Sequence, residues 1–348
     1  MQKGSIGFYV FVIAVIGIAT YVSNQFKQSF ANEHQKDDYE MVKQYLLNDS
    51  PLYGYNRPKI WIHSQYEVNA RTWKNFMSRN STDLNQPYLY LTIQSIINHC
   101  SKDFHVCLID DESFSKLIPN WDVSMNMLPE PQKSKFRKIG MLQLLYFYGG
   151  MVLPNSFLCT QNMRSFYDQS TKNDKMFVAE NVNKHTNMLN EKPKSVFVPD
   201  TQIMGTTKNN DMLKSWIEFL RSDVSNGHFS QEMDFLGSEN SMLQKLVTQQ
   251  QIHLISGDHF GVKKRNGSPI ILDDLMEENF LDVDMSQLLG IQIPRDELLK
   301  RNKYQWFSIL PYKDVLNANV ILSKFFKASM VDSSSYFSSG EEKSILAI

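Results

Sequence analysis

The sequence has few cysteines and carries none of the common catalytic signatures. Its three cysteines, Cys100, Cys107 and Cys159, are an odd number at low density in 348 residues, which excludes a disulfide framework and a CxxC zinc site. The patterns HExxH, GxSxG, GxxxxGK and GxGxxG are all absent. These absences exclude, as far as motifs can, zinc proteases, α/β-hydrolases, phosphate-loop proteins and dinucleotide-binding folds.

An excess of charge of either sign is also missing. Lysine and arginine total 36 and aspartate and glutamate total 37, a net charge of -1. A dedicated nucleic-acid binder would show a strong basic excess, so we expect no nucleic-acid partner. At 42% hydrophobic and 12% aromatic residues the chain has enough apolar mass for a core, which excludes disordered and fibrous classes.

One long uncharged run lies near the start of the chain. Residues 4–26 contain no charged side chain and are bracketed by Lys3 and Lys27. As a helix the run spans about 34 Å, enough to cross a bilayer. A cleaved signal peptide is the rival interpretation, since Ala14–Ala19 offers small residues. We expect residues 1–27 to anchor a single-pass, type II membrane protein, whose bulk would face the Golgi or ER lumen in a eukaryote.

The composition divides the rest of the chain into three parts. Residues 28–57 are polar and mixed and indicate a stem, residues 58–328 a folded domain, and the serine-rich residues 329–348 a disordered tail. Three sequons suit a lumenal domain but also arise by chance, and they begin at Asn48, Asn80 and Asn266.

Hydrophobic periodicity in the domain predicts an α/β fold. An apolar strand at residues 59–63, an amphipathic helix at 86–100 and a second apolar strand at 104–109 form a βαβ unit with parallel strands. Further segments continue the alternation: strands at 151–153, 176–179, 202–205 and 252–255, and helices at 131–148, 210–221 and 239–250.

Three polar residues lie at the carboxyl ends of the first two strands. Open α/β sheets bind ligands at the carboxyl ends of their strands, so His63, Asp110 and Asp111 are candidates for holding a ribose, a metal or a sugar hydroxyl. Ordinary alternatives remain for each of them. Asp111 suits the N-cap of a helix beginning near Glu112, and a lone histidine is more often structural.

Two further clusters are weaker candidates. His99, Cys100, His105 and Cys107 invite a zinc interpretation, but Cys107 sits inside an apolar strand, and buried thiols acting as small hydrophobes are the better explanation. Residues 261–267 form a basic turn between glycines. The turn either binds a phosphate or is a solvated loop, and we prefer the solvated loop.

The sequence at Leu144–Leu153, LLYFYGGMVL, resembles the DXD-motif glycosyltransferases of the capsular-polysaccharide-synthesis and initiating-mannosyltransferase type. In that family a helix ends in L-Y-x-Y-G-G and leads into a short strand and then D-x-D. Pro58–His63, PKIWIH, is similar to the family's first strand, and Gln202–Thr207 to its N-x-x-M-A-x segment. The similarity runs loosely from residue 58 to residue 260.

The resemblance implies a GT-A-like, Rossmann-related fold that binds a nucleotide sugar. It also implies Mn²⁺ or Mg²⁺ on the diphosphate, and transfer of a sugar to a glycan or lipid-linked acceptor in polysaccharide biosynthesis. On that basis we expect Asp110 and Asp111 to bind the donor, with His63 and the backbone of Gly149 and Gly150 lining its pocket.

The departures from the family pattern are concentrated at the metal site. Pro154, Asn155 and Ser156 stand where the family has D-x-D, so only neutral oxygens are left for a hard cation, and we assign no metal ligand. Lys138 and Met141 replace the helix aspartate and arginine. Arg137 and Lys138 either contact the diphosphate directly, with Asn155 and Ser156 beside it, or face solvent.

The resemblance and the departures from it imply two alternative functions. The first is a glycosyltransferase, with no residue yet identifiable as its base. The second is a membrane-anchored, catalytically inactive pseudo-glycosyltransferase that acts by binding.

Overall fold

A computed structural model describes residues 57–64, 86–129, 132–183, 196–226 and 232–337 of the chain. The expected anchor at 4–26, the stem at 28–57 except its last residue, and the sequons at Asn48 and Asn80 lie outside these ranges. Within the described residues no helix is both long and apolar enough to cross a bilayer.

The centre of the fold is a six-stranded sheet with the order β2-β1-β3-β6-β5-β7. β1 pairs in parallel with both β2 and β3, and β5 pairs in parallel with β7, while β6 runs against its two neighbours. The sheet is therefore mixed but mostly parallel. Its strands are β1 (Lys59–His63), β2 (His105–Ile109), β3 (Gly150–Val152), β5 (Phe177–Val182), β6 (Phe197–Thr206) and β7 (His253–Ile255).

The predicted βαβ unit is confirmed, because α2 (Tyr88–Cys100) connects β1 to a parallel β2. The side chains of β1 alternate between the two faces of the sheet. Trp61 enters one core and Ile60 and Ile62 enter the other. The alternation explains why a five-residue apolar strand needs helices on both sides.

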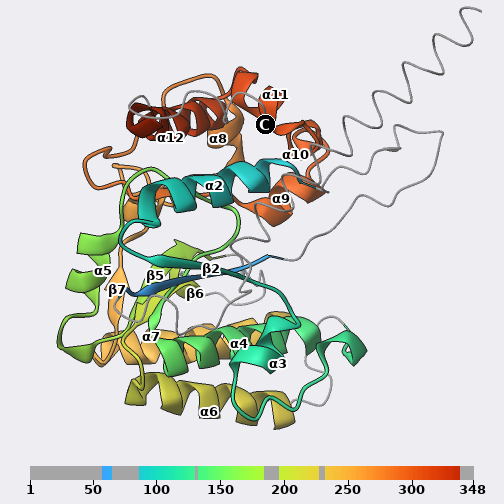
Figure 1. Cartoon of the computed structure of the whole chain (residues 1–348), viewed down its shortest axis with the longest axis vertical. Helices are drawn as coiled ribbons and strands as arrows, with labels where there is room; N and C mark the ends of the chain where they lie inside the picture. The colour runs from blue at the N-terminus through green and yellow to red at the C-terminus, as the bar shows by residue number, and fades with distance from the viewer. Residues whose placement is uncertain (1–56, 65–85, 130–131, 184–195, 227–231, 338–348) are drawn as a thin grey trace, which may run out of the picture.

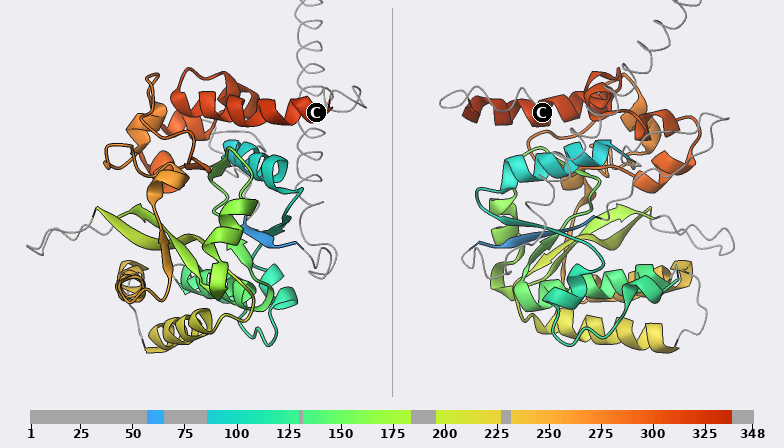
Figure 2. Two further views of the ribbon diagram at one scale, coloured as in Figure 1. Left: turned by 90° about the vertical axis from the view of Figure 1, so that its left-hand side faces the viewer. Right: turned by 45° about the vertical axis from the view of Figure 1, so that its right-hand side comes forward.

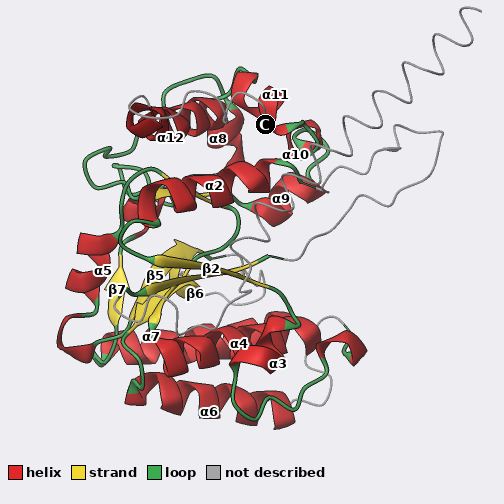
Figure 3. Cartoon of the chain, viewed as in Figure 1, coloured by secondary structure: helices red, strands yellow, loops and turns green. Residues whose placement is uncertain are grey.

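Helices cover both faces of the sheet (Figures 1 and 3). Those on one face pack around Trp61 and comprise α3 (Ser113–Leu117), α4 (Gln132–Tyr148), α6 (Asp211–Asn226) and α7 (Glu232–Thr248). Those on the other face pack around Ile60 and comprise α2 and α5 (Arg164–Ser170).

A third layer covers the outer side of α2 (Figure 2). It consists of short helices and a long terminal one: α8 (Leu272–Met276), α9 (Arg295–Lys300), α10 (Gln305–Ser308), α11 (Tyr312–Asn317) and α12 (Ile321–Phe337). A two-stranded sheet of β4 (Phe157–Cys159) and β8 (Gly290–Gln292), which periodicity did not predict, joins this layer to the rest. Single turns of 3-10 helix complete the elements at Met125–Met127, Lys172–Asp174 and Gly257–Phe260.

The predicted start of the disordered tail at residue 329 is wrong, because α12 continues to Phe337. Ser329 is only 2% exposed, and its hydroxyl donates to the backbone oxygen of Cys159 at 2.6 Å. A serine inside a helix can satisfy its hydroxyl on a neighbouring element, so composition alone misjudged this segment. Residues 338–348 lie outside the described ranges.

Candidate functional site

The carboxyl ends of three parallel strands meet at one edge of the sheet. β1 ends at His63, β2 leads into Asp110 and Asp111, and β3 leads into Pro154 and Asn155. The chain passes from β1 to β2 on one side and then to β3 on the other. Such a reversal of strand order opens a crevice where α/β sheets bind ligands.

A clamp of three side chains, His63, Asp111 and Arg137, holds this edge together. Arg137 on α4 donates to both carboxylate oxygens of Asp111, from Nε and from one terminal nitrogen, each at 2.7 Å. His63 Nε2 lies 3.0 Å from Asp111 Oδ1 and donates to it in the tautomer that suits a carboxylate. The two-point contact fixes the plane of the guanidinium and leaves Asp111 little rotational freedom.

Asp111 is 7% exposed and remains a carboxylate. Burial opposes its ionisation, but the hydrogen bonds from Arg137 and His63 outweigh that effect and hold the pKa of Asp111 well below its usual range. The imidazole of His63 also stacks on Phe114, with the ring planes 9° apart. The orientation of His63 is therefore set on two sides.

Asp110, and not Asp111 as the sequence suggested, makes the hydrogen bonds at the start of α3. Asp111 does not cap α3. Instead, Asp110 Oδ1 accepts hydrogen bonds from the backbone nitrogen and the hydroxyl of Ser113, at 2.9 and 2.7 Å. Asp110 thus organises the start of the helix, and Asp111 turns to His63 and Arg137 because its carboxylate finds two nitrogen donors there.

A cavity of about 250 Å³, here called the switch-point cavity, opens beside the clamp. It lies where β1, β3, α4 and β6 meet, and Asp111 stands behind its wall. Its lining residues are His63, Arg137, Lys138, Met141, Leu142, Val152, Leu153, Pro154, Asn155, Thr201, Gln202 and Met204.

Of the two alternatives for Arg137 and Lys138, simple exposure to solvent is wrong, because both side chains are paired with carboxylates. The ammonium group of Lys138 is paired with the carboxylate of Glu239 on α7. Glu239 is fully buried and also accepts a hydrogen bond from the Thr201 hydroxyl at 3.0 Å. Burial raises the pKa of Glu239, and Lys138 opposes that rise.

Most of the positions at which the sequence differs from the family that it resembles line this cavity. Lys138 and Met141 on α4 and Pro154 and Asn155 after β3 all line it. Ser156 does not, and is buried against the neighbouring cavity described below. Asn155 is 7% exposed, and its backbone oxygen accepts a hydrogen bond from Thr92.

Gly149 and Gly150 lie at the opposite ends of the strands from the switch-point cavity and do not line it, contrary to what we expected of the donor pocket. β3 runs in the same direction as β1, and Gly150 is its first residue, beside Lys59 at the start of β1. A Cβ on Gly150 would stand 2.1 Å from the Lys59 carbonyl oxygen. The backbone oxygen of Gly149 accepts a hydrogen bond from the indole of Trp61 at 3.0 Å. Both glycines serve close packing of strands.

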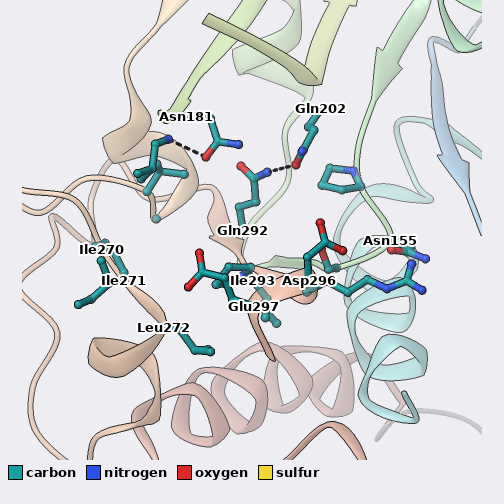
Figure 4. A pocket seen from close by; sticks show the side chains of 17 residues that line it. Asn155, Asn181, Gln202, Ile270, Ile271, Leu272, Gln292, Ile293, Asp296 and Glu297 are labelled. Carbon is teal, nitrogen blue, oxygen red and sulfur yellow. Dashed lines mark hydrogen bonds between the residues drawn. The ribbon is translucent and has the colours of Figure 1, made fainter. Parts of the chain in front are cut away.

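A second cavity of about 180 Å³ adjoins the first and is here called the amide cavity (Figure 4). The two share Pro154, Asn155 and Gln202. The amide cavity is otherwise lined by Ser156, Asn181, Val182, Gly261, Val262, Ile270, Ile271, Leu272, Gln292, Ile293, Pro294, Arg295, Asp296 and Glu297.

The weaker sequence candidates have structural explanations. The basic turn has its cations paired, Lys263 with Glu180 and Lys264 with Asp274, which favours the non-phosphate interpretation. Cys107 and Cys100 are buried in the cores on opposite faces of the sheet, so they cannot share a zinc ion. Among the described residues no group of three or more histidine, cysteine or acidic side chains is arranged to hold a metal.

Sequence reasoning missed four residues of this region: Thr201, Glu239, Gln292 and Asp296. Glu239 lies 101 residues from Lys138 in the chain, and Gln292 lies 90 residues from Gln202. Thr201 immediately precedes the recognised segment that begins at Gln202, which was the one available signal.

Comparison with known proteins gives only remote matches. No family model and no curated protein matches the chain. Among solved structures, the PaToxG glycosyltransferase is 12% identical with a TM-score of 0.33 and covers 64% of this chain and 80% of that one. Two structures of the glycosyltransferase GlyE of Streptococcus pneumoniae TIGR4, one an apo form, are 8% and 10% identical, with TM-scores of 0.37 and 0.36.

The chain covers 64% of the length of GlyE, and the match extends over 78% of this chain. Similarity at this level does not identify an activity for the chain.

Proposed function

We propose that the chain is a glycosyltransferase-like protein that binds a nucleoside-diphosphate sugar at the switch-point cavity. The observation that carries this proposal is the position and chemistry of the cavity. It lies at the carboxyl ends of β1 and β3, where the strand order reverses, and is lined by His63, Arg137 and Lys138. A diphosphate is the ligand that two cations in one cavity suit best.

The residues present do not fit the Mn²⁺ or Mg²⁺ that the family resemblance implies. Pro154 offers no side-chain ligand, and Asn155 and Ser156 offer neutral oxygens that face two different cavities. Arg137 and Lys138 would instead place fixed positive charge beside the leaving diphosphate. An ammonium has three donors and Glu239 takes one of them, so Lys138 keeps capacity for a phosphate oxygen.

His63 is the residue best placed to accept a proton. With Nε2–H donated to Asp111, the lone pair resides on Nδ1 of an imidazole that lines the cavity. In the transfer step the acceptor oxygen would bond to the anomeric carbon and its proton would pass to Nδ1. The bond from that carbon to the diphosphate would break, and the electron pair would leave with the phosphate oxygen.

The second candidate, a pseudo-glycosyltransferase that binds without turnover, rests on a specific observation. Each cation of the cavity is already paired, Arg137 with Asp111 and Lys138 with Glu239. Pairing lowers the positive potential available to a diphosphate. It therefore favours weak binding over the strong electrostatic stabilisation that catalysis requires.

The membrane setting also belongs to the proposal. Anchoring through residues 4–26 would place the domain near a membrane-bound glycan or lipid-linked acceptor. The apolar run, which is long enough to span a bilayer, supports this topology. Proteolytic mapping of the full-length chain in sealed vesicles tests this topology. A protease added outside the vesicles should leave the lumenal domain intact, and digestion of the domain in intact vesicles would contradict the topology.

Calorimetry on the detergent-solubilised full chain tests donor binding. UDP and GDP should bind with and without Mn²⁺, and Lys138→Ala should weaken binding about tenfold, or about 1.4 kcal/mol. Lys116→Ala on α3, an exposed lysine outside the cavity, is the matched control. Binding that strictly requires Mn²⁺ would contradict the assignment of the phosphate contacts to Arg137 and Lys138.

Turnover separates the two candidates. In a donor-hydrolysis or transfer assay with the nucleotide sugar that binds, His63→Gln should abolish turnover and leave the dissociation constant within about twofold. Donor binding without detectable turnover in the unmodified chain favours the pseudo-glycosyltransferase.

A further inference from the structure

The amide cavity differs from the switch-point cavity in the chemistry of its walls. Its polar side chains include amides and two carboxylates: Asn155, Asn181, Gln202, Gln292, Asp296 and Glu297. Arg295 is the one basic residue among its lining residues. The lining therefore carries a formal charge of -1, from two carboxylates and one guanidinium.

Two glutamines that line this cavity point toward one another (Figure 4). Gln292 Nε2 on β8 donates to Gln202 Oε1 on β6 at 2.5 Å. This bond leaves Gln292 Oε1 as an acceptor and the Gln202 amide nitrogen as a donor. Such paired donors and acceptors match a ligand whose hydroxyls both donate and accept.

Asn155 and Asp296 add polar capacity from two further sides. Among the described residues the structure gives no hydrogen-bond partner to the side chain of either one. By contrast, the Asn181 side chain is satisfied, because it donates to Asp200 at 2.6 Å and accepts from the backbone nitrogen of Val182 at 2.8 Å. Asn181 therefore shapes the wall, while Asn155 and Asp296 remain available to a ligand.

The remaining wall is apolar and the space is small. Ile270, Leu272 and Ile293 line it. A volume of about 180 Å³ equals the space of about six waters, which suits one sugar ring and not a chain of them. Apolar walls with a few placed polar groups are typical of small-molecule sites.

We propose that the amide cavity is a subsite for one uncharged sugar ring and that Asp296 and Glu297 exclude sugars that carry a carboxylate. The subsite extends the nucleotide-sugar site proposed above and rests on it for the position of the donor. Because the two cavities meet at Asn155 and Gln202, a ligand with an anionic end and a neutral, hydroxylated end fits both. The sugar belongs either to the donor or to the end of an acceptor glycan.

Calorimetry on the full-length chain with four probes tests the subsite: UDP, UDP-glucose, GDP-mannose and UDP-glucuronate. We expect at least one uncharged nucleotide sugar to bind about fivefold tighter than its free nucleoside diphosphate, and UDP-glucuronate to bind more weakly than UDP. Gln292→Ala should remove the gain from the sugar and leave UDP or GDP binding unchanged. Gln249→Ala, an exposed glutamine beyond the end of α7, is the matched control and should change neither.

The double variant Asp296→Asn with Glu297→Gln separates charge from shape. It should restore UDP-glucuronate binding to the level of UDP, because both side chains keep their size and lose their charge. An unchanged difference between UDP-glucuronate and UDP would overturn the charge-based exclusion. A gain from the sugar that survives Gln292→Ala would overturn the subsite.

Saturation-transfer NMR with methyl hexosides and short oligosaccharides, without nucleotide, tests whether the sugar in the subsite belongs to an acceptor glycan. Glycan binding that depends on Gln292, in a chain that binds no nucleotide, would refute the donor proposal and support the subsite as an acceptor or lectin-like site. If neither nucleotide sugars nor free sugars bind in a Gln292-dependent way, the subsite is refuted, even where UDP alone binds.

Discussion

The two adjoining cavities handle charge in opposite ways. The switch-point cavity places Arg137 and Lys138 at its wall, each paired with a buried carboxylate from another element. The amide cavity relies on neutral glutamine and asparagine side chains, with Asp296 and Glu297 at its border. The two adjoining cavities of one crevice therefore present side chains of different charge.

The cavities also differ in which parts of the fold build them. The walls of the switch-point cavity come from the edge of the main sheet and from α4, which pack around the core that contains Trp61. The amide cavity adds β8, the start of α9 and the segment before α8. Gln202 belongs to both, because β6 passes between them.

The largest effect is expected away from both cavities. Gly150→Val should cost about 4 kcal/mol or more of unfolding free energy, because Gly150 has a φ of +101° and a Cβ there would clash with the Lys59 carbonyl. Thermal unfolding of the full-length chain measures it. The matched control is Gly267→Ala, with a φ of +82° and nothing within 4 Å, which should cost about 1 kcal/mol. Equal effects of the two variants would contradict the packing role of Gly150.

The next effect concerns the clamp and is expected to depend on pH. Asp111→Asn leaves Arg137 without its carboxylate partner and should cost about 3 kcal/mol at neutral pH. Because the pKa of Asp111 is lowered in the folded chain, its stabilising effect is present above the unfolded-state pKa of about 4 and is lost as pH falls below it. The difference in unfolding free energy between the native chain and Asp111→Asn should therefore narrow below about pH 4.

Asp122→Asn supplies the control for that measurement, since Asp122 is exposed. Its difference from the native chain should stay near zero from pH 3 to 7. A constant gap for Asp111→Asn over the same range would contradict the lowered pKa.

Carboxylates introduced at positions 154 and 156 should bind a divalent cation at the junction of the two cavities. Pro154 borders both cavities and Ser156 borders the amide cavity, so Pro154→Asp with Ser156→Asp would place carboxylates along their junction. UDP binding should then become about tenfold tighter in Mn²⁺, because anionic oxygens hold a divalent cation that neutral ones do not. Pro154→Asn with Ser156→Asn is the uncharged control. A response to Mn²⁺ in that control would refute the electrostatic explanation.

The smallest effect should come from the partner of Lys138. Glu239→Gln keeps the shape of the side chain and releases the charge of Lys138 into the cavity, so UDP binding should tighten about threefold. Calorimetry measures it, and adding Lys138→Gln should cancel the gain. Weaker binding in Glu239→Gln alone would mean that Glu239 positions Lys138 more than it neutralises it.

Much of the fold could be predicted from local pattern, while only part of the site could. The apolar run of β1, the amphipathic α2 and the end of α4 just before Gly149 follow from periodicity and glycine chemistry. His63 was found because it ends a strand, and Asn155 because it stands at the D-x-D positions of the family that the sequence resembles. Glu239 and Gln292 were missed because helix α7 and the short strand β8 carry no local sign of where they pack.

The sequence predicted the positions of neighbouring residues better than it predicted which role each residue has. Asp110 and Asp111 stand at the predicted edge, yet which one caps α3 depends on where Arg137 and Ser113 lie. Gly149 and Gly150 both have a positive φ, and they lie at the strand ends away from the switch-point cavity.

The sequence by itself determined the alternation of strands and helices and the position of His63, Asp110 and Asp111 at the carboxyl ends of neighbouring strands, because these depend on residues close together in the chain. Only the tertiary structure decided how charge is arranged there. Arg137 meets Asp111 across 26 residues, and Lys138 meets Glu239 across 101. Such pairs form where helices pack on the sheet, and their energy depends on burial that no local pattern records.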